Sequence, residues 1–293
     1  VTVELTFDPP ADDGGGVEVY RVYPHLQGFS DWSSVKQLII PASNIDATLT
    51  DFPVYVNLTD LGTDFFQNTQ NNGGDIRITE SDGTTEVPRE LVFCDIANEK
   101  GELHFKADLS NTEDNIFYIY YGNATEINYP ANHEFGSHNV WEESLKANWH
   151  LGENPAGAPP QMIDFTEYGN NGITYGSMTS DQIIDGKVGK ALSFDGVNDY
   201  VTMPSSNLDF LGAANQSFTI STWIKADNTG SHKVIADKTK IASGTAWVIF
   251  QVLSSGEIDG QLYNGSINPI IRTSSSYEEP IWHLATLIRD ASN

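Results

Sequence analysis

Residues 218–225 read Phe218-Thr-Ile-Ser-Thr-Trp-Ile-Lys225, and apolar or β-branched side chains occupy every second position of the run. The same alternation recurs in Trp282-His-Leu-Ala-Thr-Leu-Ile-Arg-Asp290 and, earlier, in Phe52-Pro-Val-Tyr-Val-Asn-Leu58. A period of two places successive side chains on opposite faces of a β-strand. Each run therefore predicts a strand with one buried face.

Short turn signals separate the strand runs along the whole chain. They are Asn72-Gly-Gly74, Ser81-Asp-Gly83, Asp195-Gly196, Ser255-Gly256 and Asn264-Gly265. Many short strands with frequent turns are typical of antiparallel sandwiches, so we expect an all-β protein. One stretch, Val140–Trp149, instead has Trp141, Leu145 and Trp149 four residues apart and predicts a short helix.

The second half of the chain has a recognisable order of motifs. Gly189-Lys-Ala-Leu-Ser-Phe-Asp-Gly-Val-Asn-Asp-Tyr-Val201 precedes the runs at 218–225 and 282–290. Together they resemble the laminin-G-like (LamG) family, which implies a concanavalin-like jelly roll over residues 139–293. In that family a further hairpin or two follows the Trp-His strand, so we expect an incomplete jelly roll here.

The first half resembles a different family. Phe52-Pro-Val-Tyr-Val56, Gly74-Asp-Ile-Arg-Ile78, Asp82-Gly83 and Phe117-Tyr-Ile-Tyr-Tyr-Gly-Asn123 occur in order. This order is similar to domain of unknown function 2341 of bacteria and archaea, over about residues 33–130. The resemblance implies a second antiparallel β-sandwich, which we place at 30–138, and carries no established activity. Residues 1–29 are then a β-rich arm or the tail of a preceding domain.

Composition excludes several classes of partner. The chain of 293 residues has 40 acidic and 15 basic residues, a formal charge of -25. Such a charge repels nucleic acid and anionic membranes, and no apolar stretch approaches the ~20 residues that a membrane helix needs. We therefore expect neither nucleic-acid binding nor membrane insertion. The single cysteine, Cys94, lies in an apolar run and predicts a buried, inert thiol.

One motif suggests glycoside hydrolysis. Some glucanases with a jelly-roll fold carry Glu-x-Asp-x-Glu or Glu-x-Asp-x-x-Glu on one strand, and retaining hydrolysis needs two carboxyl groups roughly 5 Å apart. Here Glu257 and Asp259 are present, but Gln261 and Leu262 occupy the two positions of the second Glu. An amide cannot shuttle a proton, so we expect no catalytic residue.

A second motif suggests a zinc protease. His133-Glu-Phe-Gly-Ser-His138 separates its two histidines by five positions, whereas a His-Glu-x-x-His helix places them four apart on one face. A spacing of five turns the second imidazole away, and Gly136 weakens any helix. We therefore predict a polar loop.

Calcium is the expected cofactor. Ile163-Asp-Phe-Thr-Glu-Tyr-Gly-Asn-Asn-Gly172 resembles the opening of LamG domains, with Thr166 and Glu167 departing from the usual Ser-Gly. Jelly rolls of this type often bind Ca²⁺ through an early Asp and other oxygen ligands. The candidate ligands are Asp164, Asn170, Asp195, Asn198 and Asp199. Asp-Gly and Asn-Asp are also ordinary turn sequences.

Sugar binding would need exposed aromatic side chains. Trp247, Tyr263 and Tyr277 are the candidates for a carbohydrate-binding surface. Trp223 and Trp282 lie on strands with a core face, so we expect them to pack in the core.

These features favour a non-catalytic adhesion or glycan-recognition module of a secreted, cell-surface or appendage protein, with a glycan or surface polysaccharide as partner. A structural virion protein (tail, fibre or decoration protein) that forms a homo-oligomer or contacts other appendage subunits is an alternative. A second alternative is an accessory module of a polysaccharide-degrading enzyme. The LamG resemblance implies a fold, and fold alone does not establish function.

Overall fold

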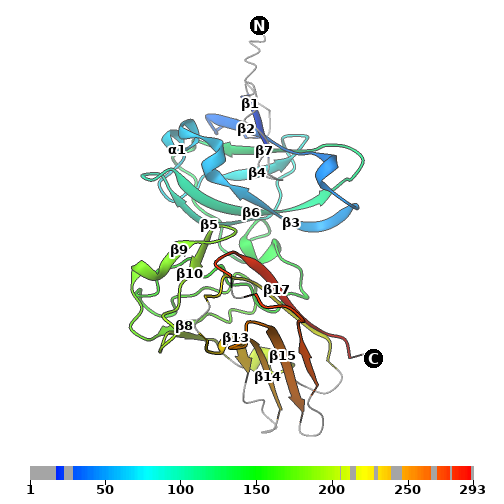
Figure 1. The fold of residues 1–293 in the computed structure, drawn as a ribbon. Helices are drawn as coiled ribbons and strands as arrows, with labels where there is room; N and C mark the ends of the chain where they lie inside the picture. The colour runs from blue at the N-terminus through cyan, green and yellow to red at the C-terminus, as the bar shows by residue number, and fades with distance from the viewer. Residues whose placement is uncertain are drawn as a thin grey trace. The chain divides into compact units, whose positions relative to one another are not determined.

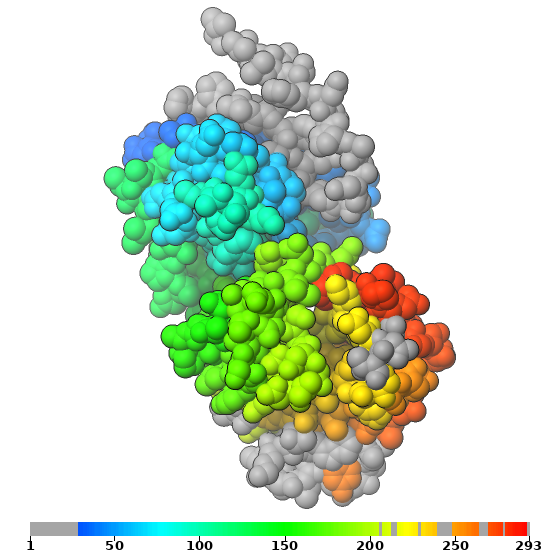
Figure 2. Space-filling model, turned by 60° about the vertical axis from the view of Figure 1, so that its left-hand side comes forward, coloured from blue at the N-terminus to red at the C-terminus, as the bar shows by residue number. Residues whose placement is uncertain are grey.

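The computed structural model describes residues 29–204, 206–211, 216–227, 230–238, 246–264, 269–277 and 279–291, and the backbone of Glu18–Val22; the side chains of Ser206, Ala246, Trp247 and Asn264 are outside this description. The chain divides into two compact units, coloured along the sequence in Figure 1 and Figure 2. The first unit ends at Asn148 and includes Phe165–Glu167. The second comprises Trp149–Asp164 and the chain from Tyr168 onward.

The first unit is a sandwich of two antiparallel sheets (Figure 1). One sheet has the order β1-β2-β7-β4, formed by Glu18–Val22, Ser34–Ile40, Asn115–Tyr121 and Arg77–Glu80. The other has the order β3-β6-β5, formed by Leu49–Asn57, Lys100–Leu109 and Arg89–Asp95. Helix α1 (Thr63–Asn68) and 3-10 helices at Ala42–Asn44, Leu58–Leu61 and Ser137–Asn139 complete the unit.

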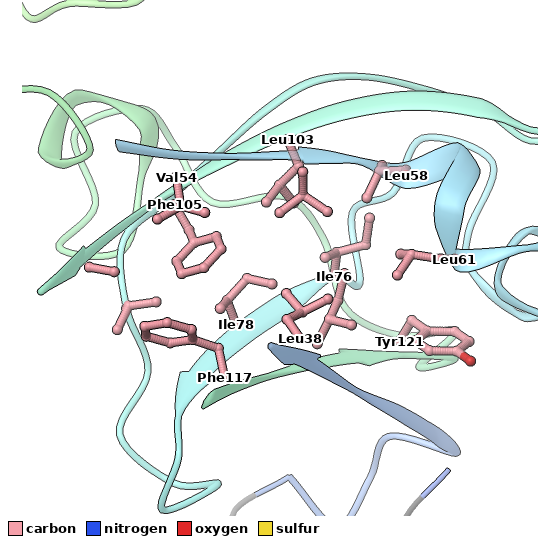
Figure 3. Close-up of a cluster of buried hydrophobic side chains, with 14 of the residues drawn as sticks. Leu38, Val54, Leu58, Leu61, Ile76, Ile78, Leu103, Phe105, Phe117 and Tyr121 are labelled. Carbon is pink, nitrogen blue, oxygen red and sulfur yellow. The ribbon is translucent and has the colours of Figure 1, made fainter. Parts of the chain in front are cut away.

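The core of the first unit lies between these sheets. Figure 3 shows Leu38, Ile78 and Phe117 of one sheet pointing towards Val54 and Phe105 of the other. Each of these side chains is buried, which stabilises the sandwich by about 1.5–3 kcal/mol per large apolar residue. The predicted period-two pattern at 52–58 is confirmed at Val54, Val56 and Leu58, which are buried, whereas Phe52 at its start is exposed.

A buried arginine lies on the face of β4 that points away from the sandwich core, because its neighbours Ile76 and Ile78 are core residues. Arg77 is fully buried, and its guanidinium carbon lies 5.6 Å from the ring centre of Trp32 and 4.1 Å from that of Tyr129. Its Nη2 donates to a carboxylate oxygen of Glu126 at 2.9 Å. Ion pairing and ring stacking together offset the cost of burying the charge.

The loop predicted for the His133–His138 motif is confirmed. The segment consists of turns followed by a short 3-10 helix at Ser137–Asn139. The His133 ring stacks on the ring of Tyr129, with a centroid distance of 4.1 Å, and its Nδ1 accepts from the backbone N–H of Phe135. This histidine therefore packs against Tyr129, the ring on which Arg77 also stacks.

Part of the predicted N-terminal arm belongs to the first sandwich. Strand β1 pairs antiparallel with β2, with Glu18 opposite Ile39 and Val22 opposite Lys36. It is an edge strand of the four-stranded sheet. The other residues before Phe29 lie outside the described part of the chain.

The second unit is also made of antiparallel strands. A two-stranded sheet joins β12 (Phe218–Ile224) to β17 (His283–Arg289), and a four-stranded sheet has the order β13-β14-β15-β16. Its strands are Lys233–Lys238, Ala246–Val252, Ile258–Asn264 and Ile270–Arg272. Two ribbons pair β9 (Ile183–Asp185) with β10 (Lys190–Leu192), and β8 (Ile173–Tyr175) with β11 (Tyr200–Thr202). Short 3-10 helices lie at Ser180–Gln182 and Ser206–Leu208.

The core of the second unit lies between the two larger sheets. Its buried members are Phe218 of β12, Val248 and Phe250 of β14, and Ala285 and Leu287 of β17. The sheets approach closely at Gly260, where an added Cβ would lie 2.5 Å from a methyl group of Leu287. This contact identifies the face of β15 that points inwards.

The prediction of core packing for Trp223 is wrong. Trp223 is 38% exposed, and its β17 neighbour Leu284 is 56% exposed on the same outer face. The inner face of β17 instead carries the small and medium side chains Ala285 and Leu287. Trp282 is half-buried, with the Lys225 ammonium 5.2 Å from its ring centre.

The helix predicted over Val140–Trp149 is also absent. The segment forms turns and extended chain. The indole N–H of Trp141 donates to a Glu90 carboxylate oxygen, whereas that of Trp149 donates to the Asn170 carbonyl at 2.9 Å. A helix of this length has little stability of its own, so these tertiary hydrogen bonds prevail over the four-residue spacing.

Two smaller predictions can be compared with the structure. Cys94 is partly buried against the core of the first unit, and this burial raises the pKa of its thiol to about 11, which agrees with the predicted inert thiol. In the described parts of the chain, no helix has the length and apolar character needed to cross a membrane.

Candidate functional site

The outer face of the four-stranded sheet in the second unit carries a row of polar side chains. Asp259 of β15 lies directly opposite Gln251 of β14 on one side and Arg272 of β16 on the other. Gln261 follows two residues after Asp259 and therefore points to the same face. We call these four residues the Asp259 cluster.

Asp259 is the centre of this cluster. Its Oδ2 accepts from Nε2 of Gln251 at 3.0 Å and from Nε2 of Gln261 at 2.7 Å. Its Oδ1 accepts from Nε and Nη2 of Arg272, each at 3.1 Å. The carboxylate is fully buried, while the Arg272 side chain is 49% exposed. The carboxylate thus fixes an arginine and a glutamine that reach the surface.

The cluster holds Asp259 in its ionised form. Burial acts to raise the pKa of Asp259, but hydrogen bonds from Gln251, Gln261 and Arg272 and the positive charge of Arg272 outweigh it, so the pKa is lowered. The pKa of the neighbouring Glu257 is also lowered, chiefly by a hydrogen bond from the Ser255 side chain. Neither carboxyl group is therefore tuned to donate a proton near neutral pH.

Two of the three predicted aromatic candidates are register partners on adjacent strands, and the third lies elsewhere in the unit. Tyr263 is half-buried and follows Gln261 on the outer face of β15. Trp247 pairs with Tyr263 through the backbone, and its side chain lies outside the described part. Tyr277 donates its backbone N–H to the Gly256 carbonyl, and its ring makes an edge contact with His283.

Two of the predicted calcium ligands lie in contact. Asp164 is 4% exposed, and its Oδ2 accepts the backbone N–H of Asn170 at 2.8 Å. The side chain of Asn171 also accepts the backbone N–H of Asp164, at 2.8 Å. A buried carboxylate among amide oxygens has the hard-oxygen chemistry of a Ca²⁺ site. Ligation of calcium by Asp164 and Asn170 stays a prediction.

The other three predicted ligands form one exposed turn. Oδ1 of Asp195 accepts the backbone N–H groups of Val197, Asn198 and Asp199 at 2.8, 3.1 and 3.2 Å. Oδ2 of Asp199 accepts the N–H of Asp195 at 3.0 Å. The backbone hydrogen bonds from Val197 and Asn198 lower the pKa of Asp195. Asp195 thus organises the turn. Ligation of calcium by Asp195, Asn198 and Asp199 stays a prediction.

Sequence reasoning missed two members of the Asp259 cluster. Gln251 and Arg272 come from strands other than that of Asp259, so no local motif connects them. The available signal in the sequence was alternation: Gln251 stands between Phe250 and Val252, which are both buried, so its side chain points to the other face. The register of the sheet was needed to bring the side chains together.

Comparisons with known proteins bear mainly on the second unit. A family model described as concanavalin A-like lectin/glucanases superfamily, of the laminin-G type, matches residues 195–293. With the sheets described above, the fold of the second unit is a concanavalin-like jelly roll. The resemblance of residues 33–130 to domain of unknown function 2341 stays a prediction. No curated protein shows significant sequence similarity to the chain.

One solved structure is similar at low identity. It is an S-layer domain-containing protein (residues 221–444) from Clostridium thermocellum, with 22% sequence identity and a TM-score of 0.37. The match covers 48% of this chain and 67% of that one.

Proposed function

We propose that the chain is a non-catalytic glycan-recognition module of a secreted or surface protein, and that it binds sugar through the outer face of the sheet β13-β14-β15-β16. The observation that carries the proposal is the Asp259 cluster. A buried carboxylate holds Gln261 and the half-exposed Arg272 in fixed positions at the surface. Fixed amide and guanidinium groups can exchange hydrogen bonds with sugar hydroxyls at little cost in side-chain entropy.

The ionisation of the site supports recognition rather than hydrolysis. A retaining glycosidase needs one carboxyl group with a raised pKa to protonate the leaving oxygen. The pKa values of Asp259 and Glu257 are both lowered, and an amide, Gln261, follows on the strand where a second Glu would be needed. We therefore propose that bound polysaccharide is not cleaved.

The first experiment measures binding of the purified chain to soluble neutral and acidic polysaccharides, with Ca²⁺ and with chelator. Reducing ends are assayed in the same samples. We expect the chain to bind polysaccharide without releasing reducing ends. Release would overturn the non-catalytic role, and failure to bind any polysaccharide would overturn glycan recognition.

Variants locate the binding surface. Gln261→Ala removes one member of the Asp259 cluster, and Thr286→Ala removes a polar side chain from the outer face of β17 as a matched control. Weaker binding by Gln261→Ala alone is expected. Equal binding by both variants would remove the Asp259 cluster from the proposal.

A structural role in a virion or other appendage is the second candidate. It is favoured by apolar side chains on the outer face of β12 and β17, where Trp223, Leu284 and Ile288 are 38%, 56% and 68% exposed. Contact with another subunit would cover such side chains. Light scattering on the purified chain tests this candidate, since a concentration-independent monomer would contradict self-assembly.

A further inference from the structure

A pair of tyrosines projects from the ribbon formed by β8 and β11. Tyr175 and Tyr200 are register partners, and their ring centroids lie 4.9 Å apart with an angle of 6° between the ring planes. Tyr175 is 44% exposed and Tyr200 is 51% exposed. The surface that includes this part of the chain, in yellow-green, faces the viewer in Figure 2.

The ribbon holds these rings away from the core. Val201, next to Tyr200, points inwards and packs against the buried side chains Met162, Met178 and Leu192. Successive strand residues point to opposite faces, so Tyr175 and Tyr200 lie on the outer face. Their mutual stacking keeps each ring in one orientation, and roughly half of each side chain stays exposed to solvent.

An acidic turn adjoins the tyrosine pair. Asp199 immediately precedes Tyr200, and an added Cβ at Gly176, the residue after Tyr175, would lie 2.3 Å from Oδ1 of Asp199. The hydrogen bonds of Asp195 to the backbone of this turn hold it in place. The two aspartates therefore place negative charge next to the strands that carry the tyrosines.

We propose that Tyr175 and Tyr200 form a second sugar-binding site, which takes an uncharged pyranose chain. The C–H faces of a pyranose pack well on an aromatic ring, and two parallel rings held in register offer such a surface. The carboxylates of Asp195 and Asp199, in a protein of net charge -25, repel uronic acids and sulfated sugars. Charge repulsion therefore disfavours acidic glycans relative to neutral ones.

The tyrosine site is separate from the Asp259 cluster. Its assignment rests on the proposed function only because both take the second unit to bind glycans. Both proposals attribute glycan binding to the second unit, but they assign it to different side chains. The two proposals can therefore fail independently, and one set of variants distinguishes them.

The test is titration calorimetry of the full chain with three hexasaccharides, of glucose, of N-acetylglucosamine and of galacturonic acid. The double variant Tyr175→Ala/Tyr200→Ala removes both rings, and Tyr175→Phe/Tyr200→Phe is the matched control that keeps them. We expect at least one neutral hexasaccharide to bind. The Ala variant is expected to bind it about tenfold more weakly, and the Phe variant to bind nearly as well as the parent chain.

Several outcomes would overturn the inference. They are unchanged affinity in the Ala variant, binding of the galacturonic acid hexamer in preference to the neutral ones, and absence of binding by all neutral probes. Thermal unfolding of each variant verifies the fold. Because both rings are exposed, a melting temperature close to that of the parent chain is expected.

Comparison with Gln261→Ala separates this inference from the proposed function. Loss of binding in Gln261→Ala with full binding in the Tyr-to-Ala variant would overturn the second site and leave the Asp259 cluster as the binding surface. The reverse result supports the tyrosine site and removes the Asp259 cluster. Loss in both variants supports both surfaces.

Discussion

At the scale of single residues, the clearest feature is the buried carboxylate of Asp259, both oxygens of which accept hydrogen bonds. Asp259 receives four hydrogen bonds from three side chains, two of which also reach the surface. If one hydrogen-bond partner is removed, the remaining buried polar groups are left partly unpaired, and this lowers the free energy of unfolding. The Asp259 cluster is therefore both a stabilising element and the candidate recognition surface.

The first prediction concerns Asp259→Asn. The amide has the same shape but no charge, so Arg272 loses its ion pair and unfolding free energy at pH 7 should fall by about 2–3 kcal/mol. A lowered folded pKa stabilises the protein above the unfolded pKa of about 4, and this stabilisation is lost as pH falls through the folded value. The deficit of the variant should therefore shrink on acidification.

Urea unfolding at pH 7 and below pH 4 measures this effect. Asp227→Asn, a change at an exposed aspartate in the same unit, is the control and should cost little at either pH. A deficit of equal size in the two variants would contradict the assigned role of Asp259.

The second prediction concerns Gln261→Glu. The new carboxyl group would lie near the position of an amide nitrogen 2.7 Å from Oδ2 of Asp259. The Asp259 charge would raise the folded pKa of the introduced carboxyl group above its unfolded value of about 4.3. The loss of stability should then be about 1–3 kcal/mol at pH 8, and it should disappear as pH falls towards the unfolded pKa, where the protonated acid can donate to Asp259.

Melting temperatures of Gln261→Glu at pH 8 and pH 5, each relative to the parent chain, measure the effect. Gln261→Ala loses the same hydrogen bond without adding a charge, so its deficit should be similar at the two pH values. If the melting temperature of Gln261→Glu is lowered by the same amount at both pH values, the prediction is wrong.

At the scale of elements, the two large sheets of the second unit meet through residues of unequal size. Gly260 on β15 faces Leu287 on β17, and phenylalanines of β12 and β14 fill the space around them. A glycine at this point lets the strands approach, whereas its neighbours on the other face are free to carry polar groups. The same strand thus contributes to the core and to the candidate site.

The third prediction follows from this contact. Gly260→Ala places a methyl group 2.5 Å from a side-chain carbon of Leu287, and the resulting displacement should lower the free energy of unfolding by about 1–3 kcal/mol. Leu287→Ala alone should cost about 2–5 kcal/mol, because it leaves a cavity.

In the double variant the new methyl group occupies part of that cavity. The two costs should therefore be less than additive, and a double-mutant cycle by chemical denaturation measures the coupling. Simple additivity would mean that the two side chains do not meet.

At the scale of the whole molecule, the excess of negative charge governs the response to ions. With a formal charge of -25, the folded chain repels itself at neutral pH. Raising NaCl from about 0.1 M to about 1 M shortens the screening length from about 10 Å to about 3 Å. The melting temperature at pH 7 should therefore rise with salt.

The pH dependence of the salt effect provides its control. Near the isoelectric point of about 4.3 the net charge vanishes, and the increment from salt should become much smaller. A salt increment of the same size at both pH values would show that screening of charge repulsion is not its cause.

Calcium should stabilise beyond this general screening. A ligand that binds only the native state stabilises it by about 2.7 kcal/mol at a hundred times its dissociation constant. At matched ionic strength, Ca²⁺ should raise the melting temperature relative to chelator, and Asp164→Ala should abolish that rise. Asp195→Ala is the comparison, since Oδ1 of Asp195 accepts a backbone hydrogen bond within its own turn. An unchanged melting temperature in the parent chain would contradict the predicted calcium site.

Local patterning along the chain was enough to establish the class of fold. Period-two runs such as Phe218–Ile224 predict strands because alternation of side chains is a property of the extended backbone itself. Turn sequences such as Asp195-Gly196 predict the breaks between strands for a similarly local reason. The sequence drew attention to Asp259 only within a catalytic motif that was rejected because an amide stands at Gln261.

Only the tertiary structure decided which faces are buried and which side chains meet. Strand β17 has apolar residues on both faces, and the opposing sheet selects Ala285 and Leu287 rather than Leu284 and Ile288. The spacing of Trp141 and Trp149 suits a helix, but their indoles bond to groups distant in sequence. Pairing of Asp259 with Arg272 likewise depends on strand register, because burial and ion pairing act between residues that local periodicity does not connect.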